Sequence, residues 1–369
     1  MVEGVGKMLS PLAKRNILRI IPFGITWLFF SIVYCLLERG IIGNLDHYPA
    51  TGTPYNFSRN IFLTPISALF TGLLIGTAEI VYFNKLFLHK SFTKKILYKT
   101  LIYFAIITVF LLALASLVNS IELHASVFSK PVRYNVMLFF FNFSFWGVEI
   151  FIASIILVSL FYMEVSENLG VAVLNNFFTG KYHTPKEEER IFMFLDMKSS
   201  TTIAENLGHV KYYRMLNKYY ADLSGPIVKH SGEIYQYVGD EVIVSWKLKN
   251  GLQNNSCIRC FFAMKESLRK QTSQYNEKFG LTPEFKAGFH YGKVTAGEIG
   301  VIKKDITFTG DVLNTASRIQ GLCNTHKVDL LVSGQLMEKM NLPPGFQVTN
   351  LGEAELRGRD ERITLFTIH

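Results

Sequence analysis

The first feature of the sequence that could do chemistry is an aspartate placed beside a candidate phosphate-binding turn. Asp196 ends the apolar run "RIFMFL" and is followed by "MKSSTT". Ser and Thr residues are typical of a turn into a helix N-terminus, where free backbone N–H groups and the helix dipole favour an anion. A carboxylate repels a bound phosphate unless a divalent cation lies between them. The pattern therefore predicts a metal and a polyphosphate, with phosphate-binding candidates Lys198, Ser199, Ser200 and Thr201. Taken alone, these residues could simply start a turn and cap a helix.

A second carboxylate, Asp240, lies in "IYQYVGDEVIV" at a Gly-Asp turn between two runs of β-forming residues. If the strands flanking this turn neighbour the strand that ends at Asp196, the two carboxylates converge. Two carboxylates with open coordination positions suit Mg²⁺ or Mn²⁺, which keep water and take phosphate oxygens. A Gly-Asp turn is also common in hairpins that have no function.

A third candidate is the pair Asn314 and Arg318 in "TFTGDVLNTASRIQ". They are i, i+4 neighbours and share one face of a predicted helix. Near a nucleotide, the amide can orient a ribose and the guanidinium can hold the charge that develops on a phosphorus during transfer. As isolated residues they would be an ordinary exposed polar face.

Strands and helices that could position these residues alternate from residue 190 onward. Helices are expected over 200–230, 254–279 and 311–323. Strands are expected in "RIFMFLD", on both sides of the turn in "GEIYQYVGDEVIVSW", and in "EFKAGFHYG", "DITFT", "VDLLVS" and "ITLFTI". This order predicts an α/β sandwich with a mixed, largely antiparallel sheet in residues 190–369.

Long apolar segments dominate the first part of the chain. Of the 369 residues 49% are hydrophobic and 31 are Phe, with the excess concentrated in residues 20–37, 60–84, 100–121 and 134–163. Each segment can cross the roughly 30 Å apolar core of a bilayer as a helix. Residues 1–163 are therefore predicted to form a transmembrane domain of four helices.

The positive charge of the chain lies with these segments. Residues 1–163 carry 13 Lys and Arg against 6 Asp and Glu, a net +7, and residues 164–369 carry 25 against 23, a net +2. The nearly neutral C-terminal part argues against a nucleic-acid partner. Lys and Arg concentrate before the first apolar segment and between the second and third. This predicts a multi-pass integral protein, in the cell membrane, with both termini and the C-terminal domain cytoplasmic.

A helical connector is predicted over residues 164–189, because Val165, Leu169, Val173 and Phe177 recur every four residues before "TGKYHTPKEEER" breaks the pattern. It could be a passive tether or a helix pair that carries a signal.

Two carboxylates fall inside apolar segments, Glu149 near the middle of the fourth and Glu79 near the end of the second. A carboxylate at membrane depth is a functional-site candidate. It could equally be a protonated or paired residue that fixes helix packing, with Asn142 as a nearby partner for Glu149. The sequence leaves both interpretations open.

Four ordered blocks within residues 190–368 resemble the class III nucleotidyl cyclases, which make cyclic AMP or cyclic GMP. The blocks are "FLDMKSST", "YQYVGDEV", "GFHYGKVTAGEIG" and "TGDVLNTASR". The membrane part resembles, less specifically, the multi-span anchors of many such enzymes.

The resemblance implies a head-to-tail dimer with the active site at the interface. One protomer would supply Asp196 and Asp240 as ligands of two Mg²⁺ or Mn²⁺ ions. The other would supply the remaining residues: Gln236 and Thr307 for the base, Asn314 for the ribose and Arg318 for the phosphate. A homodimer could thus hold two complete sites. The implied reaction is attack of the ribose 3′-hydroxyl on the α-phosphate with release of pyrophosphate. Arg357 lies where family members often have a Lys for the terminal phosphates.

The choice of base is the point at which this chain departs from the family pattern. Adenylyl cyclases of the family commonly have Lys at the position of Gln236 and Asp or Thr at that of Thr307, whereas guanylyl cyclases have Glu and Cys. Thr307 fits one adenylyl subgroup and Gln236 fits neither rule. Gln and Thr can each donate and accept a hydrogen bond. Because Thr307 fits an adenylyl subgroup and no Glu stands at position 236, the sequence favours ATP and keeps GTP as the alternative.

Two other classes remain as rivals. "VGDEV" resembles the Gly-Gly-Asp-Glu-Phe signature of diguanylate cyclases, but Val238 replaces the first Gly and "NTASR" is foreign to that family. The second rival is a membrane receptor with a catalytically weak, nucleotide-binding cyclase domain. The presence of both Asp residues together with Asn314 and Arg318 argues against such decay.

Overall fold

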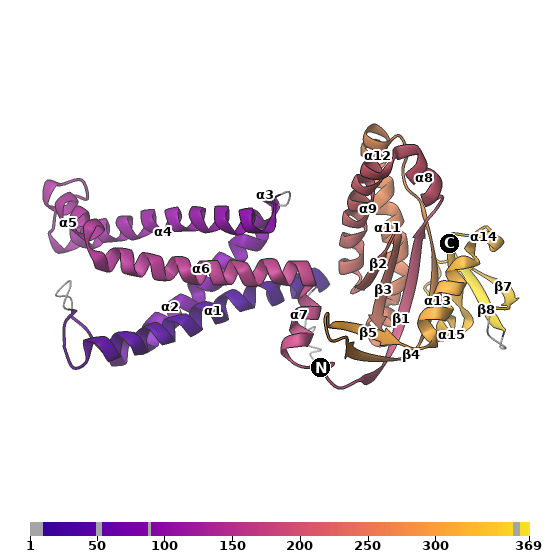
Figure 1. Cartoon of the computed structure of the whole chain (residues 1–369), viewed down its shortest axis with the longest axis horizontal. Coiled ribbons are helices and arrows are strands. Elements are labelled where there is room, and N and C mark those ends of the chain that lie inside the picture. Colours follow the sequence, from indigo (N-terminus) through magenta and orange to yellow (C-terminus); the bar gives the residue numbers. More distant parts are fainter. Residues whose placement is uncertain (1–9, 49–53, 88–89, 357–361) are drawn as a thin grey trace, which may run out of the picture. The chain divides into compact units, whose positions relative to one another are not determined.

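The computed structural model describes residues 10–48, 54–87, 90–356 and 362–369. Its contacts divide the chain into a helical unit, Ala13–Asn175, and a second unit that chiefly holds Asn176–His369. Each unit is described by itself (Figure 1).

The helical unit contains four helices that are long and apolar enough to cross a membrane. They are α1 (Pro11–Ile42), α2 (Phe57–Ala78) with its π-helical extension η1 (Glu79–Phe83), α4 (Phe92–Glu122) and α6 (Phe143–Leu169). Shorter helices follow η1 and α4, namely α3 (Asn84–Leu86) and α5 (Lys130–Phe141). Large apolar side chains remain exposed along the long helices, as expected for surfaces that face lipid.

The predicted fourth segment, 134–163, is wrong as a single helix, because α5 ends before Asn142 and α6 begins after it. Asn142 has an extended backbone, and its side-chain oxygen accepts a hydrogen bond from the backbone N–H of Ser144 at 2.8 Å. An amide in this position caps a new helix rather than continuing the old one. Glu149 therefore lies about two turns from the start of α6 and not in the middle of that helix.

A buried ionic cluster joins three of the long helical segments. Lys99 of α4 is fully buried and forms ion pairs with Glu79 of η1 and with Glu164 of α6, the latter at 3.1 Å. Tyr103 donates a hydrogen bond to Glu79 at 3.0 Å, and Lys95 lies 3.3 Å from Glu164. Buried charges persist in apolar surroundings only when they are paired in this way.

The second unit is built on one sheet whose strand order is β2-β3-β1-β4-β6-β8-β7, with β5 paired to β4. The strands are β1 (Lys186–Met197), β2 (Glu233–Val238), β3 (Glu241–Lys247), β4 (Phe285–Ile299), β5 (Asp305–Thr309), β6 (Leu330–Ser333), β7 (Val348–Ala354) and β8 (Ile363–Ile368). The β4–β6 pair is parallel and the other pairs are antiparallel. The predicted mixed, largely antiparallel sheet is confirmed.

Helices cover both faces of this sheet (Figure 1). One face packs against α8 (Ser200–Leu207), α9 (His209–Lys229), α11 (Ser256–Lys270) and α12 (Thr272–Phe279). The other packs against α13 (Asp311–Gly321). β1 alternates accordingly: Ile191, Met193 and Leu195 enter the larger helical layer, whereas Phe192 and Phe194 face α13. The remaining short helices are α7 (Val171–Phe178), α10 (Leu248–Leu252), η2 (Gln253–Asn255), α14 (Cys323–His326) and α15 (Gly334–Met337).

Three element boundaries differ from the sequence expectation. The predicted helix 254–279 is interrupted at Gln271, which separates α11 from α12. The predicted helical connector is interrupted at Gly170, whose φ of +91° lies in a region that L side chains rarely adopt, so α6 and α7 are separate helices. β1 begins at Lys186, within the predicted connector, because it pairs there with the long strand β4.

Candidate active site

The two predicted metal ligands lie together at one end of the sheet. Asp196 is the second-to-last residue of β1, and Asp240 follows Gly239 in the β2–β3 turn. Because β3 pairs with β1 up to Leu195 and Val242, this turn lies beside the end of β1. The pKa of Asp196 is raised, first by burial and then by the carboxylate of Asp240. Two like charges this close disfavour their joint ionisation unless a cation lies between them.

This carboxylate pair fits a divalent cation. Oδ2 of Asp240 is buried and has no hydrogen-bond partner among the described residues, so it is an acceptor without a donor. In the described part of the chain no cluster of three or more His, Cys, Asp or Glu is arranged to hold a metal. Two protein carboxylates with the other positions left to water and phosphate match the preference of Mg²⁺.

Lys286 and Gln320 hold Asp196 in place, and neither was expected from the sequence. Lys286 of β4 is the direct cross-strand partner of Asp196, and its ammonium lies 3.5 Å from Oδ2. The side-chain amide of Gln320, from the end of α13, donates to the same oxygen at 3.3 Å. The sequence offers one indication of this contact, the Lys in "EFKAGFHYG". Only the β1–β4 register shows that this Lys lies opposite Asp196.

A β-bulge decides which face of the sheet Gln236 occupies. Ile234 pairs with Val244 and Gln236 with Ile243, so Tyr235 between them has no partner residue on β3. Ile243 belongs to the α13 face, whereas Val244 faces the larger helical layer. With regular alternation Gln236 would follow Ile234 into the helical layer. The bulge instead turns its exposed side chain to the α13 face, the face of Phe194 and Asp196.

Thr307, the other base-reading candidate, lies on β5 opposite Gly297 of β4. Its hydroxyl oxygen is buried and has no hydrogen-bond partner within the described residues. A buried hydroxyl usually has a partner, and one without a partner is available to a ligand or a water.

Two glycines of β4 set how closely α13 approaches the sheet. A Cβ on Gly288 would lie 2.3 Å from the backbone nitrogen of Gln320, and one on Gly292 would lie 2.7 Å from Val312. This explains the spacing of the block "GFHYG", because any side chain at Gly288 would push the helix away.

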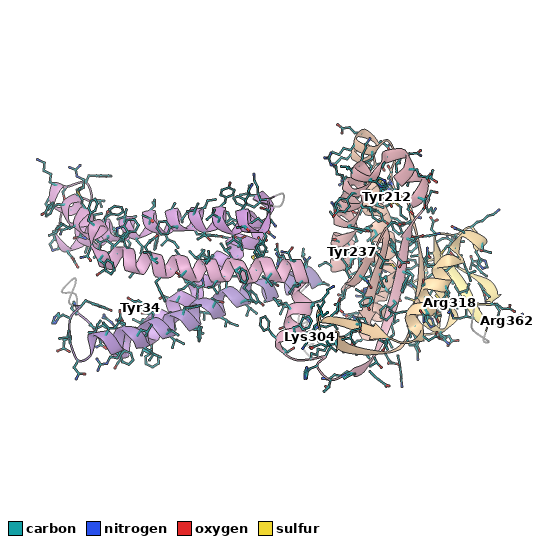
Figure 2. The ribbon with its side chains drawn as sticks, viewed as in Figure 1. Tyr34, Tyr212, Tyr237, Lys304, Arg318 and Arg362 are labelled. Atoms are coloured by element: carbon teal, nitrogen blue, oxygen red, sulfur yellow. The ribbon has the colours of Figure 1, made fainter. Side chains whose placement is uncertain are left out.

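α13 carries Asn314, which is exposed, and Arg318, which is half-buried. Arg318 is labelled in Figure 2. Among the described residues, no hydrogen bond or ion pair joins either of them to Asp196 or Asp240. The single protomer therefore brings the two carboxylates together but not the complete predicted set.

The residues of the predicted phosphate cradle form the turn between β1 and α8. α8 begins at Ser200, and Ser199 before it has a φ of +54° and makes no side-chain capping bond, so Ser199 is not a conventional cap. Lys198 is already held by carboxylates, with its ammonium 3.1 Å from Glu284 and 2.6 Å from Asp329. It would have to exchange these partners to bind a phosphate. Thr201 lies in the first turn of α8, and Arg357 lies outside the described residues.

Tyrosines of α9 support the Asp240 turn from the helical side. The hydroxyl of Tyr220 donates to the backbone carbonyl of Gly239, and its ring packs on Tyr237 with centroids 4.4 Å apart. Figure 2 shows Tyr212 and Tyr237 in this part of the domain.

Burial, together with the charges of Asp196 and Asp240, raises the pKa of Glu241 to about 7. Glu241 thus responds to the charge of the carboxylate pair.

Glu149, in the helical unit, contacts Thr108 and not Asn142, the partner that one of the two sequence interpretations offered. Its Oε1 accepts a hydrogen bond from the hydroxyl of Thr108 at 2.8 Å, while its Oε2 is buried without a partner among the described residues. Asn142 is occupied as the cap of α6.

A mixed sheet with a carboxylate pair at one end and a helix that carries Asn314 and Arg318 is the arrangement that the sequence blocks predicted. Residues 183–369, half of the chain, match the family model described as the adenylate and guanylate cyclase catalytic domain. The chain belongs to this family, the class III nucleotidyl cyclases.

Parts of the chain are similar to individual known proteins. Adenylate cyclase 2 of Rhizobium meliloti (strain 1021) is 34% identical over 209 residues, which are 57% of this chain and 58% of that protein. The adenylate cyclase of Anabaena cylindrica is 25% identical over 182 residues, 48% of this chain and 36% of that protein. The chain thus spans less than two thirds of either relative. The crystal structure of the adenylyl cyclase CyaB from P. aeruginosa covers 50% of this chain and 96% of its own, at 19% identity and a TM-score of 0.45.

Proposed function

We propose that the chain is a membrane-bound adenylyl cyclase that converts ATP to cyclic AMP and pyrophosphate. The observation that carries the proposal is the convergence of Asp196 and Asp240 on a cyclase domain, with a buried oxygen of Asp240 left without a donor. A buried acceptor of this kind is costly unless a ligand satisfies it.

Asp196 and Asp240 would hold two Mg²⁺ or Mn²⁺ ions, with the cradle of Ser199, Ser200 and Thr201 beside them for the triphosphate. When bound, the ions would lower the pKa of the ribose 3′-hydroxyl and neutralise the phosphates. Lys286 and Gln320 fix the orientation of the Asp196 carboxylate from the side of β4 and α13. Lys198 and Arg357 are weaker candidates for the terminal phosphates, since Lys198 is already paired and Arg357 lies outside the described residues.

Asn314 and Arg318 would act on the ribose and the α-phosphate of the partner's site in a head-to-tail homodimer. This assignment follows from the family resemblance, and it is consistent with the absence of contacts to the carboxylate pair within the described protomer. Arg318 is suited to the charge that develops on the phosphate oxygens, because a guanidinium offers a fixed set of donors.

Gln236 and Thr307 would read the base, and their chemistry favours ATP. Adenine presents an amino donor and the N1 acceptor. The amide of Gln236 and the hydroxyl of Thr307 can each donate and accept a hydrogen bond, so both the amino group and N1 of adenine can be matched. The 34% identity to an adenylate cyclase supports the same choice. Guanine could also satisfy these groups, so a guanylyl cyclase is the alternative outcome of the assay.

The membrane half would place the enzyme as a multi-pass protein of the cell membrane, with both termini and the cyclase domain cytoplasmic. The support is the concentration of Lys and Arg before the first long helix and between the second and the third, the segments that would be cytoplasmic.

Assay of the purified full-length chain with ATP and with GTP, each with Mg²⁺ or Mn²⁺, tests the proposal. We expect cyclic AMP, and we expect Asp240→Asn to lower its production by about 100-fold or more, because one carboxylate of the pair loses its charge. Asp222→Asn is the matched control, since Asp222 of α9 pairs with Lys218 and does not contact the site. Cyclic GMP as the sole product would correct the substrate, and activity that survives Asp240→Asn would refute the two-metal assignment.

A further inference from the structure

One charged side chain on the α13 face of the sheet has no role in the proposed chemistry. Arg190 of β1 is 1% exposed. One of its terminal nitrogens donates to Glu188 at 2.8 Å, and the other donates to Ser245 at 2.9 Å and to Glu233. Burial lowers the pKa of Arg190, but the charge and hydrogen bonds of Glu233 and Glu188 outweigh it, so the net change is upward. The guanidinium is thus a permanent cation held between two strands.

The same guanidinium lies over an aromatic ring. Its central carbon is 4.5 Å from the ring centroid of Phe308 on β5. The ring of Phe308 packs on Tyr235 of β2 with centroids 5.1 Å apart, and its backbone N–H donates to the Tyr235 hydroxyl at 3.4 Å. Phe192 contacts both rings. Stacking of this type requires the planar group of an Arg and would not be reproduced by a Lys.

These contacts bridge two strands that are not paired with each other. In the sheet, β2 pairs with β3 and β5 pairs with β4, so β3, β1 and β4 lie between β2 and β5. No ladder hydrogen bond therefore fixes the distance from β2 to β5. Two connections cross the face of the sheet instead. Phe308 contacts Tyr235 directly, and Arg190 reaches β2 at Glu233 and β5 at Phe308.

The two bridged strands carry the two base-reading candidates. Gln236 follows the bulged Tyr235 on β2, and Thr307 precedes Phe308 on β5. We propose that Arg190 is a positioning residue that sets the spacing between Gln236 and Thr307 and thereby the choice of nucleotide base. This inference rests on the proposed cyclase function. Discrimination between bases depends on donors and acceptors being held at the right separation, so a small shift of either strand changes the match.

Two single variants interrupt the bridge at its two ends. Glu233→Gln weakens the link to β2 at a half-exposed side chain, and Phe308→Leu removes the stacked ring on β5 without changing charge. Arg190→Lys keeps the positive charge but loses the planar stacking. Two matched controls change similar groups elsewhere in the domain. Phe346 lies 5.6 Å below the guanidinium of Arg259, and Glu266 pairs with Arg269 on α11.

The experiment measures kcat and KM of the purified full-length variants for ATP and for GTP, together with their thermal unfolding. Gln236→Lys provides the reference for a direct change of a base contact. We expect each bridge variant to change the ratio of the two kcat/KM values by at least about threefold. We expect Phe346→Leu and Glu266→Gln to leave that ratio unchanged. Combining Glu233→Gln with Phe308→Leu should change the ratio less than the product of the single effects, because both act through one guanidinium.

A purely structural Arg190 gives a different result. In that case kcat/KM would fall equally for both nucleotides, in step with thermal stability, and the ratio would stay constant. That outcome overturns the inference while leaving the cyclase function intact. A wild-type chain that converts neither nucleotide overturns the proposed function and this inference with it.

Discussion

Lys286 and Asp196 face each other across the β1–β4 ladder, with the ammonium of Lys286 3.5 Å from Oδ2 of Asp196. The ammonium of Lys286 therefore lies close to where a divalent cation would bind, and its positive charge would repel that cation. We predict that Lys286→Met tightens binding of Mn²⁺ by about threefold, because removal of a nearby positive charge leaves the carboxylate pair more negative. Calorimetric titration of the full-length chain with Mn²⁺ measures the change.

Lys265→Met is the matched control for this variant, since Lys265 pairs with Asp329 rather than with Asp196. Unchanged or weaker Mn²⁺ binding in Lys286→Met would mean that the loss of carboxylate positioning by the ammonium outweighs the removal of its repulsion of the ion.

The separation of Arg318 from the carboxylate pair within one protomer leads to a complementation test. An Asp240→Asn chain and an Arg318→Ala chain should each be nearly inactive. Co-expressed in equal amounts, they should regain about a quarter of the wild-type activity, because half of the dimers are mixed and each mixed dimer has one intact site. Cyclic AMP formation by the unfractionated mixture is the measurement, and different affinity tags on the two chains verify that mixed dimers are present. Absence of recovery in verified mixed dimers would contradict the shared site.

Glu241 predicts a dependence of stability on pH. Its pKa is raised from 4.5 to about 7 in the folded chain, so the folded state binds a proton that the unfolded state has released. The contribution is fully present below pH 4.5 and is lost as the pH rises through about 7. In the presence of EDTA, the unfolding temperature of the cyclase domain should therefore fall over this range.

Glu241→Gln should flatten that slope, whereas Glu266→Gln, a change on the exposed surface of α11, should leave it in place. An unfolding temperature that is constant over this pH range, or a slope that persists in Glu241→Gln, would show that Glu241 does not carry the effect.

The ionic cluster of the helical unit predicts a large effect of one substitution. Lys99→Met would leave Glu79 and Glu164 buried without their shared cation. We expect a loss of about 3–5 kcal/mol in the stability of the helical unit, and partial recovery when Glu79→Gln is added. Thermal unfolding of the detergent-solubilised chain measures both, with the exposed Lys130→Met as control. A Lys99→Met chain as stable as the wild type would contradict the importance of the cluster.

The order of elements and the identity of the carboxylate pair were predictable from the sequence, because both depend on local patterns. Strand alternation, the Gly-Asp turn and the helix that carries Asn314 and Arg318 are encoded within short segments. Lys286 and Gln320 were not predictable, since their contact with Asp196 depends on the pairing of segments far apart in the chain. The bulge at Tyr235 was missed for a related reason, because it is defined only against the partner strand.

In the helical unit the apolar composition predicted the existence of the long helices but not all of their ends. Asn142 lies in a continuous apolar run, and only its capping bond to Ser144 separates α5 from α6. Likewise, the partner of Glu149 proved to be Thr108, on a helix that the sequence could not place beside it. The apolar composition indicates how many helices can span a membrane, whereas the contacts between individual helices depend on how they pack.

The bulge in β2 also has a consequence for changes in chain length. Tyr235 is the extra residue of the ladder, so its loss would restore regular pairing and still leave Gln236 opposite Ile243. Behind Gln236 there is no such extra residue: Tyr237 and Val238 are each paired, and the turn with Asp240 follows at once. The strand therefore has one spare residue before Gln236 and none after it. A deletion on the first side leaves the distance from Gln236 to Asp240 unchanged, whereas a deletion on the second shortens it.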